Sequence, residues 1–178
     1  MNRNVPTINT ARITLRAMRP GDFDRFAEIW AMPDVVRHVG GEPWGRDEAW
    51  QSFVFQAGHW QVSGFGQWAI ELHQGKKMLG QTGFFFGARG LGEDYDAHPE
   101  AAWFLDPEFA GRGLGREAAG AAHDWFDRVI TGPLVCRVAP GNDASHRLAG
   151  ILGYKVLREA VSDGRDYVLY IRKSVPQG

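Results

Sequence analysis

Polar and apolar residues repeat along this chain with the periods of strands and helices. Residues 12–17 alternate between the two kinds, which is typical of a strand with one side in solvent. Two helical patterns follow, one from a candidate N-cap at Asp22 to near Pro33, the other from Asp47 to Ser63. We expect their apolar faces to carry Phe23, Phe26, Ala27 and Trp30 in the first helix, and Trp50, Phe53, Val54 and Ala57 in the second.

The second half of the chain is richer in strands. Two runs around a short polar connection predict an antiparallel hairpin over 67–72 and 78–86. The pattern then predicts, in order, a strand at 101–105, a helix from 114 to about 129, a strand at 134–138, a helix at 144–152 and a closing strand pair at 154–161 and 167–172.

These elements give the order β-α-α-β-β-β-α-β-α-β-β, which predicts one mixed α/β domain over 12–173. Residues 1–11 are polar and unpatterned, so we expect a flexible N-terminal arm, and we expect 174–178 to form a C-terminal tail. A chain of 178 residues is long enough to bury one core of ordinary size.

Composition excludes several classes of protein. Hydrophobic content of 44% and charged content of 23% are near the globular average, which argues against disorder. A net charge of −1 without long basic runs argues against nucleic-acid binding. We find neither an apolar run long enough for a membrane helix nor a signal-peptide pattern, so we expect a cytoplasmic protein. The single cysteine, Cys136, fits a buried strand, and the histidines lack the spacing of metal ligands, so no metal is expected.

The richest stretch in chemistry is the turn between the 101–105 strand and the following helix. Gly111, Gly113 and Gly115 allow close approach of the backbone and positive φ angles. A helix that starts there presents unpaired N–H groups and the positive end of its dipole. Arg112 and Arg116 add two cations, unless both are simply solvated, so a phosphate group is the expected guest.

Three phosphate-binding motifs are possible at such a turn. A P-loop is excluded because its G-x-x-x-x-G-K-[ST] string is absent. A dinucleotide fingerprint is formally present at 113–118, but its turn should follow the strand at once, and Asp106–Ala110 intervenes. The next strand ends at Arg137-Val138-Ala139, without the expected acidic residue. Antiparallel hairpins also flank it, where alternating strands and helices are expected.

The third possibility matches the whole chain. Residues 110–115 resemble the [QR]-x-x-G-x-[GA] coenzyme A loop of the GNAT N-acetyltransferase superfamily, although Ala110 replaces the usual Gln or Arg. The element order from Arg12 to Arg172 is similar as well. Four further segments resemble the branch of ribosomal-protein N-terminal acetyltransferases: Thr14-Leu15-Arg16 with Pro20-Gly21-Asp22-Phe23, Glu100 to Pro107, Asn142 to Ser145, and Leu152-Gly153-Tyr154.

The resemblance implies a largely antiparallel central sheet flanked by helices and acetyl-CoA as cosubstrate. Its pantetheine arm would lie along Phe104 and Leu105, with a main-chain N–H near Leu105 as the oxyanion donor. Asn142 would bond the pantetheine amides and Ser145 would approach the sulfur, although both can instead only cap their helix. The loop around the pyrophosphate would comprise Ala110, Gly111, Arg112, Gly113, Leu114, Gly115 and Arg116.

The implied reaction is direct attack of a neutral primary amine on the acetyl thioester. Such an amine is mostly protonated at neutral pH, so a base is needed, and the resemblance implies Glu100, with His98 as second candidate. Either can instead be an ordinary surface residue. Many relatives have a tyrosine that acts as general acid at the position where this chain has Ala149, and its absence leaves Ser145 as the proton donor.

The acceptor is less defined by the sequence. The expected amines are, in falling order, a protein N-terminus, an amino acid, a polyamine and an aminoglycoside. The resemblance places His38 and Trp44 near the acceptor, while the acidic loop 93–96 either attracts a cationic amine or is a solvated loop. The alternative function is a CoA-binding sensor or interaction domain without turnover. A homodimer is possible, and neither a membrane nor a nucleic-acid partner is expected.

Overall fold

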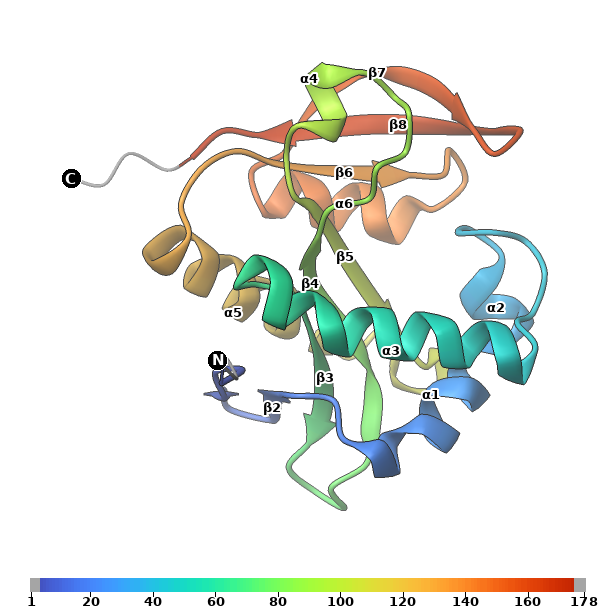
Figure 1. Ribbon diagram of the computed structural model, residues 1–178, viewed down its shortest axis with the longest axis vertical. Helices are drawn as coiled ribbons and strands as arrows, with labels where there is room; N and C mark the ends of the chain where they lie inside the picture. The colour runs from blue at the N-terminus through green and yellow to red at the C-terminus, as the bar shows by residue number, and fades with distance from the viewer. Residues whose placement is uncertain (1–3, 175–178) are drawn as a thin grey trace. The chain divides into compact units, whose positions relative to one another are not determined.

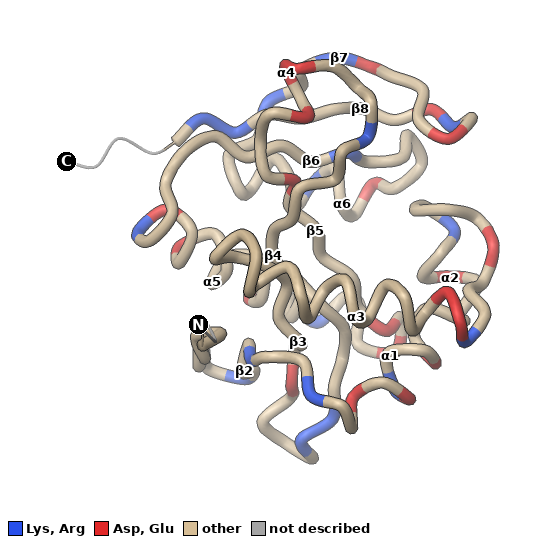
Figure 2. Tube along the Cα trace, in the orientation of Figure 1, with Lys and Arg blue, Asp and Glu red and all other residues tan. Residues whose placement is uncertain are grey.

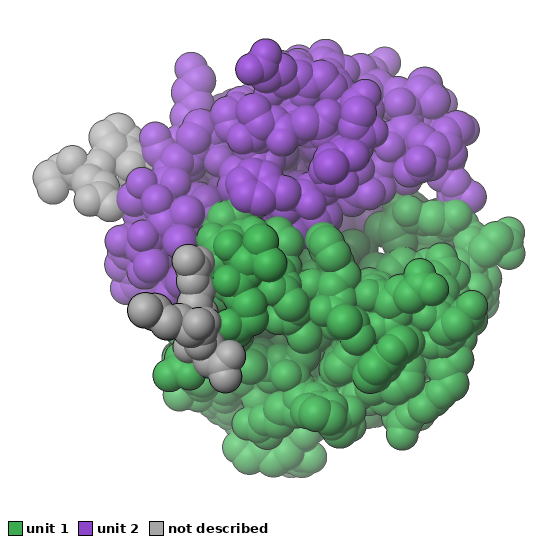
Figure 3. Space-filling model, in the orientation of Figure 1, with its two compact units in different colours: residues 1–83, 102–122 green, residues 84–101, 123–178 purple. Residues whose placement is uncertain are grey.

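A computed structural model of the chain describes residues 4–174. The hydrogen-bonded strand order is β1 (Ile8–Asn9), β2 (Ile13–Arg16), β3 (Gln67–Leu72), β4 (Met78–Phe85), β5 (Glu100–Leu105), β6 (Leu134–Val138), β8 (Arg165–Arg172) and β7 (Lys155–Ser162). The fold is therefore mixed α/β with a mostly antiparallel sheet, as predicted (Figure 1). The predicted elements follow one another in the predicted order, with the short elements β1, α2 (Pro33–Val36) and α4 (Glu93–Asp96) in addition. The chain divides into two compact units, of which unit 1 comprises residues up to 83 with 102–122, and unit 2 comprises 84–101 with the residues from 123 on (Figure 3).

Unit 1 contains antiparallel strands. Strand β2 (Ile13–Arg16) pairs with β3 (Gln67–Leu72), and β3 pairs with β4 (Met78–Phe85), so the predicted hairpin is confirmed. A short strand β1 (Ile8–Asn9) pairs with β2, and the Trp68 indole N–H donates to the Pro6 carbonyl at 2.8 Å. The described part of the expected flexible arm is thus a paired edge of the sheet, which the prediction missed because a two-residue strand has no period to detect.

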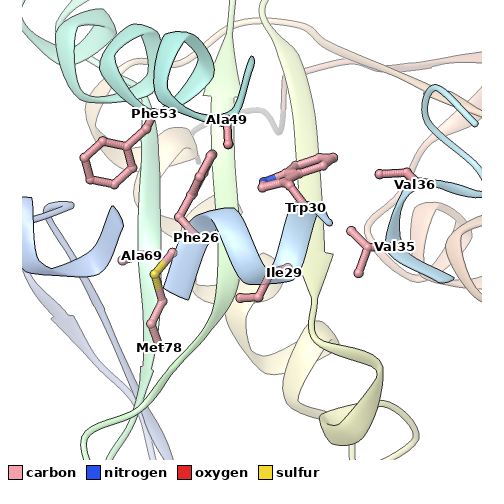
Figure 4. Close-up of a cluster of buried hydrophobic side chains, with 9 residues drawn as sticks. All are labelled: Phe26, Ile29, Trp30, Val35, Val36, Ala49, Phe53, Ala69 and Met78. Atoms are coloured by element: carbon pink, nitrogen blue, oxygen red, sulfur yellow. The ribbon is translucent and has the colours of Figure 1, made fainter. Parts of the chain in front are cut away.

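Between β2 and β3, unit 1 contains the 3-10 turn η1 (Pro20–Asp22) and the helices α1 (Phe23–Trp30), α2 (Pro33–Val36) and α3 (Arg46–Ser63). The apolar face of α1 is buried as predicted against α3 and the sheet (Figure 4). Helix α3 ends at Gly64, whose φ of 80° is the left-handed geometry of a helix C-cap. The cluster drawn in Figure 4 comprises Phe26, Ile29, Trp30, Val35, Val36, Ala49, Phe53, Ala69 and Met78.

The predicted apolar face of α3 is partly wrong. Trp50 is 51% exposed and Val54 is 49% exposed, and Ala57 is exposed as well. The face that packs inward carries instead Ala49, Phe53, Gln56, His59 and Trp60. This helix has apolar residues around most of its circumference, so periodicity alone could not identify the buried side.

A buried ion cluster connects the start of α1 with the sheet. The Arg16 guanidinium donates to Asp22 at 2.7 Å and to Glu71 at 2.6 Å. Burial of the Asp22 carboxyl opposes its ionisation, but hydrogen bonds from Arg16 and from the Arg19 N–H outweigh this and lower its pKa. Asp22 occupies the N-cap position of α1, as predicted, but its side chain makes no cap hydrogen bond to that helix and serves as the counter-ion of Arg16.

Unit 2 carries the C-terminal strands. Strand β5 (Glu100–Leu105) starts here and pairs in parallel with β6 (Leu134–Val138) at Glu100 and Val135. Strand β8 (Arg165–Arg172) lies between β6 and β7 (Lys155–Ser162) and is antiparallel to both, so the predicted closing hairpin is confirmed. The short helices of this unit are α4 (Glu93–Asp96) and α6 (Asp143–Ile151). Within residues 4–174, no helix has both the length and the apolarity to cross a membrane.

Candidate functional site

The turn that follows β5 is fixed by Asp106, which is buried. Its carboxylate accepts from the Glu108 N–H at 2.9 Å and pairs with Arg25, while its own N–H donates to Leu79 O at 2.7 Å. Burial of this carboxyl opposes ionisation, but the bonds from Glu108 and Arg25 prevail and lower its pKa. The 3-10 turn η2 (Pro107–Phe109) that it caps leads directly into the glycine loop.

The glycine loop has the backbone geometry that the sequence predicted. Gly111 and Gly113 have φ angles of 75° and 77°, in the region that favours glycine. Helix α5 (Leu114–Val129) begins at once, and the Glu117 N–H donates to Gly113 O at 3.0 Å. The backbone N–H groups of residues 114–116 have no carbonyl acceptor within the helix, because they belong to its first turn. They therefore point out of the helix end as hydrogen-bond donors.

A set of ionic contacts that was not predicted holds this loop from outside. The Arg12 guanidinium donates to Arg112 O at 2.8 Å and to the Glu117 carboxylate at 2.7 Å. The Thr10 hydroxyl donates to the same carboxylate at 2.6 Å. Because these partners lie about a hundred residues apart, no local pattern could have indicated them. We call Thr10, Arg12 and Glu117 the loop brace.

Two exposed arginines complete the positive character of the loop. Arg112 lies over the Phe109 ring with its guanidinium carbon 5.4 Å from the ring centroid, and Arg116 is exposed on the first turn of α5. Outward N–H groups, a helix N-terminus and two guanidinium groups are the donor set that a pyrophosphate requires. The residues of this loop therefore fit the diphosphate of coenzyme A.

A rigid aromatic group lies in the same unit. Trp30 and Trp44 stack with ring centroids 4.0 Å apart, and Trp30 lies 4.7 Å from Phe104 of β5. The Trp30 indole N–H donates to Gln81, the first of three buried glutamines joined by amide hydrogen bonds. Trp44 is thus held in place while staying half-buried. His38 is also half-buried, and burial, with the charge of Arg37, lowers its pKa.

The candidate bases lie in unit 2. Glu100 is buried and accepts two hydrogen bonds from Arg89, at 2.9 and 3.0 Å, while Arg137 lies 3.7 Å away. A carboxylate has about four lone-pair directions, so this pairing fixes its orientation and leaves other directions open. His98 is half-buried, and its backbone N–H donates to the backbone carbonyl of Tyr95 at 3.1 Å.

Tyr95 is a buried polar residue that the sequence did not single out. Its hydroxyl has no hydrogen-bond partner among residues 4–174. Burial raises its pKa well above the usual range, and the charge of Glu100 acts in the same direction, so the hydroxyl stays protonated. The acidic residues around it have structural partners: Asp94 pairs with Arg158, and Asp96 accepts from the N–H groups of the preceding loop.

Asn142 and Ser145 are half-buried at the start of α6. The Asn142 side-chain oxygen accepts from the Ser145 N–H at 3.2 Å, so Asn142 caps this helix. Ala149 is fully buried one turn further on. The cap leaves the Asn142 amide N–H groups as donors for other contacts, so capping and ligand binding are compatible.

The remaining candidates for chemistry are structural. Cys136 is buried in β6, and burial, followed by the charge of Glu100, raises the pKa of its thiol well above the usual value. Its predicted role in packing is therefore confirmed. Within the described residues, no group of three His, Cys, Asp or Glu side chains is placed to hold a metal ion.

Comparison with known proteins gives a consistent assignment. A family model described as an acetyltransferase (GNAT) domain matches residues 12–155. A solved structure of a GNAT-family protein from Bordetella pertussis is 30% identical, covers 94% of this chain and 99% of that chain, and has a TM-score of 0.86.

Two less similar structures carry names that include an acceptor. Spermidine N-acetyltransferase from Vibrio cholerae, in complex with CoA and spermine, is 18% identical over 93% of this chain and 97% of its own, with a TM-score of 0.72. Ribosomal-protein-S5-alanine acetyltransferase from Vibrio fischeri is 15% identical, covers 98% of this chain and 100% of its own, and also has a TM-score of 0.72. At these identities the likeness concerns the fold alone.

Proposed function

The chain belongs to the GNAT acetyltransferase family, and from this premise we propose that it transfers the acetyl group of acetyl-CoA to a primary amine by direct attack in a ternary complex. It is an acyl-CoA-dependent acetyltransferase with acetyl-CoA as cosubstrate. The observation that carries the proposal is the loop after β5, where Gly111 and Gly113 at positive φ lead into the N-terminus of α5 beside two exposed arginines.

Each residue has a proposed role in this reaction. The loop from Ala110 to Arg116 binds the pyrophosphate, and β5 residues Phe104 and Leu105 lie along the pantetheine arm. Acetyl-CoA supplies an acetyl thioester, which an unprotonated amine can attack. Glu100 removes the proton from the amine, with His98 as the second candidate, and Asn142 bonds the pantetheine amides. The orientation that Arg89 imposes on Glu100 supports a fixed acceptor for the proton.

Ser145 is the proposed proton donor to the departing thiolate, since the fully buried Ala149 has no group to donate. A thiolate is a good leaving group, so removal of Ser145 should reduce the rate less than removal of the base. The proposed acceptors are, in falling order, a protein N-terminus, an amino acid, a polyamine and an aminoglycoside. The half-buried Trp44, held by its stack on Trp30, and His38 are the proposed acceptor contacts.

Thiol release from acetyl-CoA, followed with DTNB across a panel of these amines, tests the reaction. Turnover with at least one amine is the expected result. CoA binding in a calorimeter without turnover on any amine would favour the alternative, a CoA-binding sensor domain. Absence of CoA binding would contradict both functions and return the dinucleotide motif at 113–118 to consideration.

The position of the pyrophosphate is tested separately by charge removal. The double variant R112Q/R116Q should weaken CoA binding about tenfold or more, because each exposed guanidinium–phosphate contact is charge-assisted. R128Q removes an arginine from the last turn of the same helix and is the matched control. Equal affinity of both variants would refute the assignment of the loop.

A further inference from the structure

The outer face of α3 lacks the charges that an exposed helix normally carries. After the first turn, its exposed residues are Trp50, Gln51, Val54, Phe55, Ala57, Gly58, Gln61 and Val62. None is charged, in a chain with 23% charged residues. Figure 2 shows the same distribution, with colour confined to the start of α3 and the rest of the helix tan. We call these eight residues the α3 outer face.

Three apolar side chains of this face are about half exposed, and a fourth is largely exposed. Trp50 is 51% exposed, Val54 and Phe55 are each 49% exposed, and Val62 is 83% exposed. Together they leave roughly 400 Å² of apolar surface, within the size range in which an exposed patch is commonly functional. A surface helix that is apolar on both sides is expected to be covered on both.

Gly58 lies in the middle of this face, and no contact among residues 4–174 explains a glycine there. A Cβ atom added there would meet nothing within 4 Å. Glycine inside a helix lowers stability relative to alanine, so its presence needs a reason. Close approach of another helix is such a reason, because a missing side chain lets two backbones come together.

The sequence of the α3 outer face complements itself when two copies run antiparallel. In an antiparallel pair related by a two-fold axis, facing residues have position numbers with a constant sum. A sum of 112 places Val54 opposite Gly58 and Trp50 opposite Val62, so that each larger side chain faces a smaller one. The same register places Gln51 opposite Gln61.

We propose that α3 forms the interface of an antiparallel, two-fold homodimer in which Val54 of each copy packs on Gly58 of the other. The occupant is a second copy because the face is uncharged and its large and small positions match in one register. The apolar area is about half of the ~800 Å² that each partner contributes to a standard interface. The dimer is therefore weak and forms at micromolar concentrations.

Sedimentation velocity at increasing micromolar concentrations tests the association. The native chain should shift from monomer to dimer, whereas G58L should stay monomeric. The new side chain enters open space in the monomer, so the thermal midpoint of G58L should be equal or higher. G150L is the matched control, since Gly150 is an exposed helical glycine of α6 with nothing within 4 Å of a Cβ, and it should dimerise normally.

Cysteine pairs test the register independently of stability. Under a mild oxidant, Q51C mixed with Q61C should give a disulfide between the two different chains. Neither variant alone should crosslink, because each position lies ~15 Å along the axis from its own copy. Native Cys136 is buried and does not interfere. Introducing G58L into both chains should abolish the crosslink.

Three results would overturn the proposal. The first is a native chain that stays monomeric at every concentration, including one that instead binds to phosphatidylcholine–phosphatidylglycerol vesicles through α3. The second is self-association of G58L equal to that of the native chain. The third is a Q51C variant that crosslinks with itself as readily as with Q61C.

Discussion

Replacing Gly111 by alanine should weaken acetyl-CoA binding by a purely conformational effect. Gly111 has a φ of 75°, and a Cβ added there would meet nothing within 4 Å, so no clash contributes. An L-residue in the left-handed region costs about 1–2 kcal/mol, and 1.4 kcal/mol corresponds to a factor of ten in an equilibrium constant. If the alanine variant relaxes when empty and must return to positive φ on binding, Kd should rise roughly 5- to 30-fold.

Two further variants separate this effect from general damage. G111N should recover much of the affinity, because asparagine tolerates the left-handed region better than alanine. G75A imposes the same strain in the β3–β4 turn, where φ is 81° and a Cβ would again meet nothing within 4 Å. It should lower stability and leave the affinity for acetyl-CoA unchanged.

Calorimetric titration of CoA and acetyl-CoA, with the thermal midpoint of each variant, measures both quantities. The reasoning fails if G111A binds like the native chain, if G111N binds as weakly as G111A, or if G75A reduces affinity as much. Any of these would mean that the positive φ at this loop is not used for binding.

The proposed base and the buried ion cluster give three more predictions. E100Q should lower the rate about 10²- to 10⁴-fold, and an unchanged pH–rate profile in the double variant with H98A would reject both bases. R16M leaves Asp22 and Glu71 buried without their cation, and urea unfolding should show a loss of about 3–5 kcal/mol. Because the folded-state pKa of Asp22 is lowered, its contribution to the free energy of unfolding is complete above the ordinary aspartate pKa and disappears as pH falls through the lowered value. The stability of the native chain should therefore fall more steeply in acid than that of D22N.

The parts of the structure that depend on local sequence were predictable. The glycine turn, its preceding strand and its following helix are encoded by adjacent residues, so Gly111 and Gly113 were identified with their conformation. The closing hairpin around Gly164 follows from the same local rules. The family resemblance added the identity of the ligand, which the glycines alone left open.

The parts that depend on distant contacts were not predictable. The partner of Glu100 is Arg89, eleven residues away and across a loop without periodicity. The exposed side of α3 was misassigned because Trp50 and Phe53 are equally apolar, and only the packing of the rest of unit 1 decides which is buried. The ion pair of Asp22 was not predictable for a related reason, since its cation, Arg16, also pairs with the distant Glu71.

The loop brace also has a consequence for folding. Thr10 and Glu117 are separated by 107 residues, so their contact closes only after most of unit 1 has been assembled. A partly folded chain would therefore lack an ordered pyrophosphate loop, and acetyl-CoA should bind only the completed fold. Binding that is selective for the native state stabilises it by mass action. The cosubstrate concentration in the cell should thus help set how much of this protein survives proteolysis.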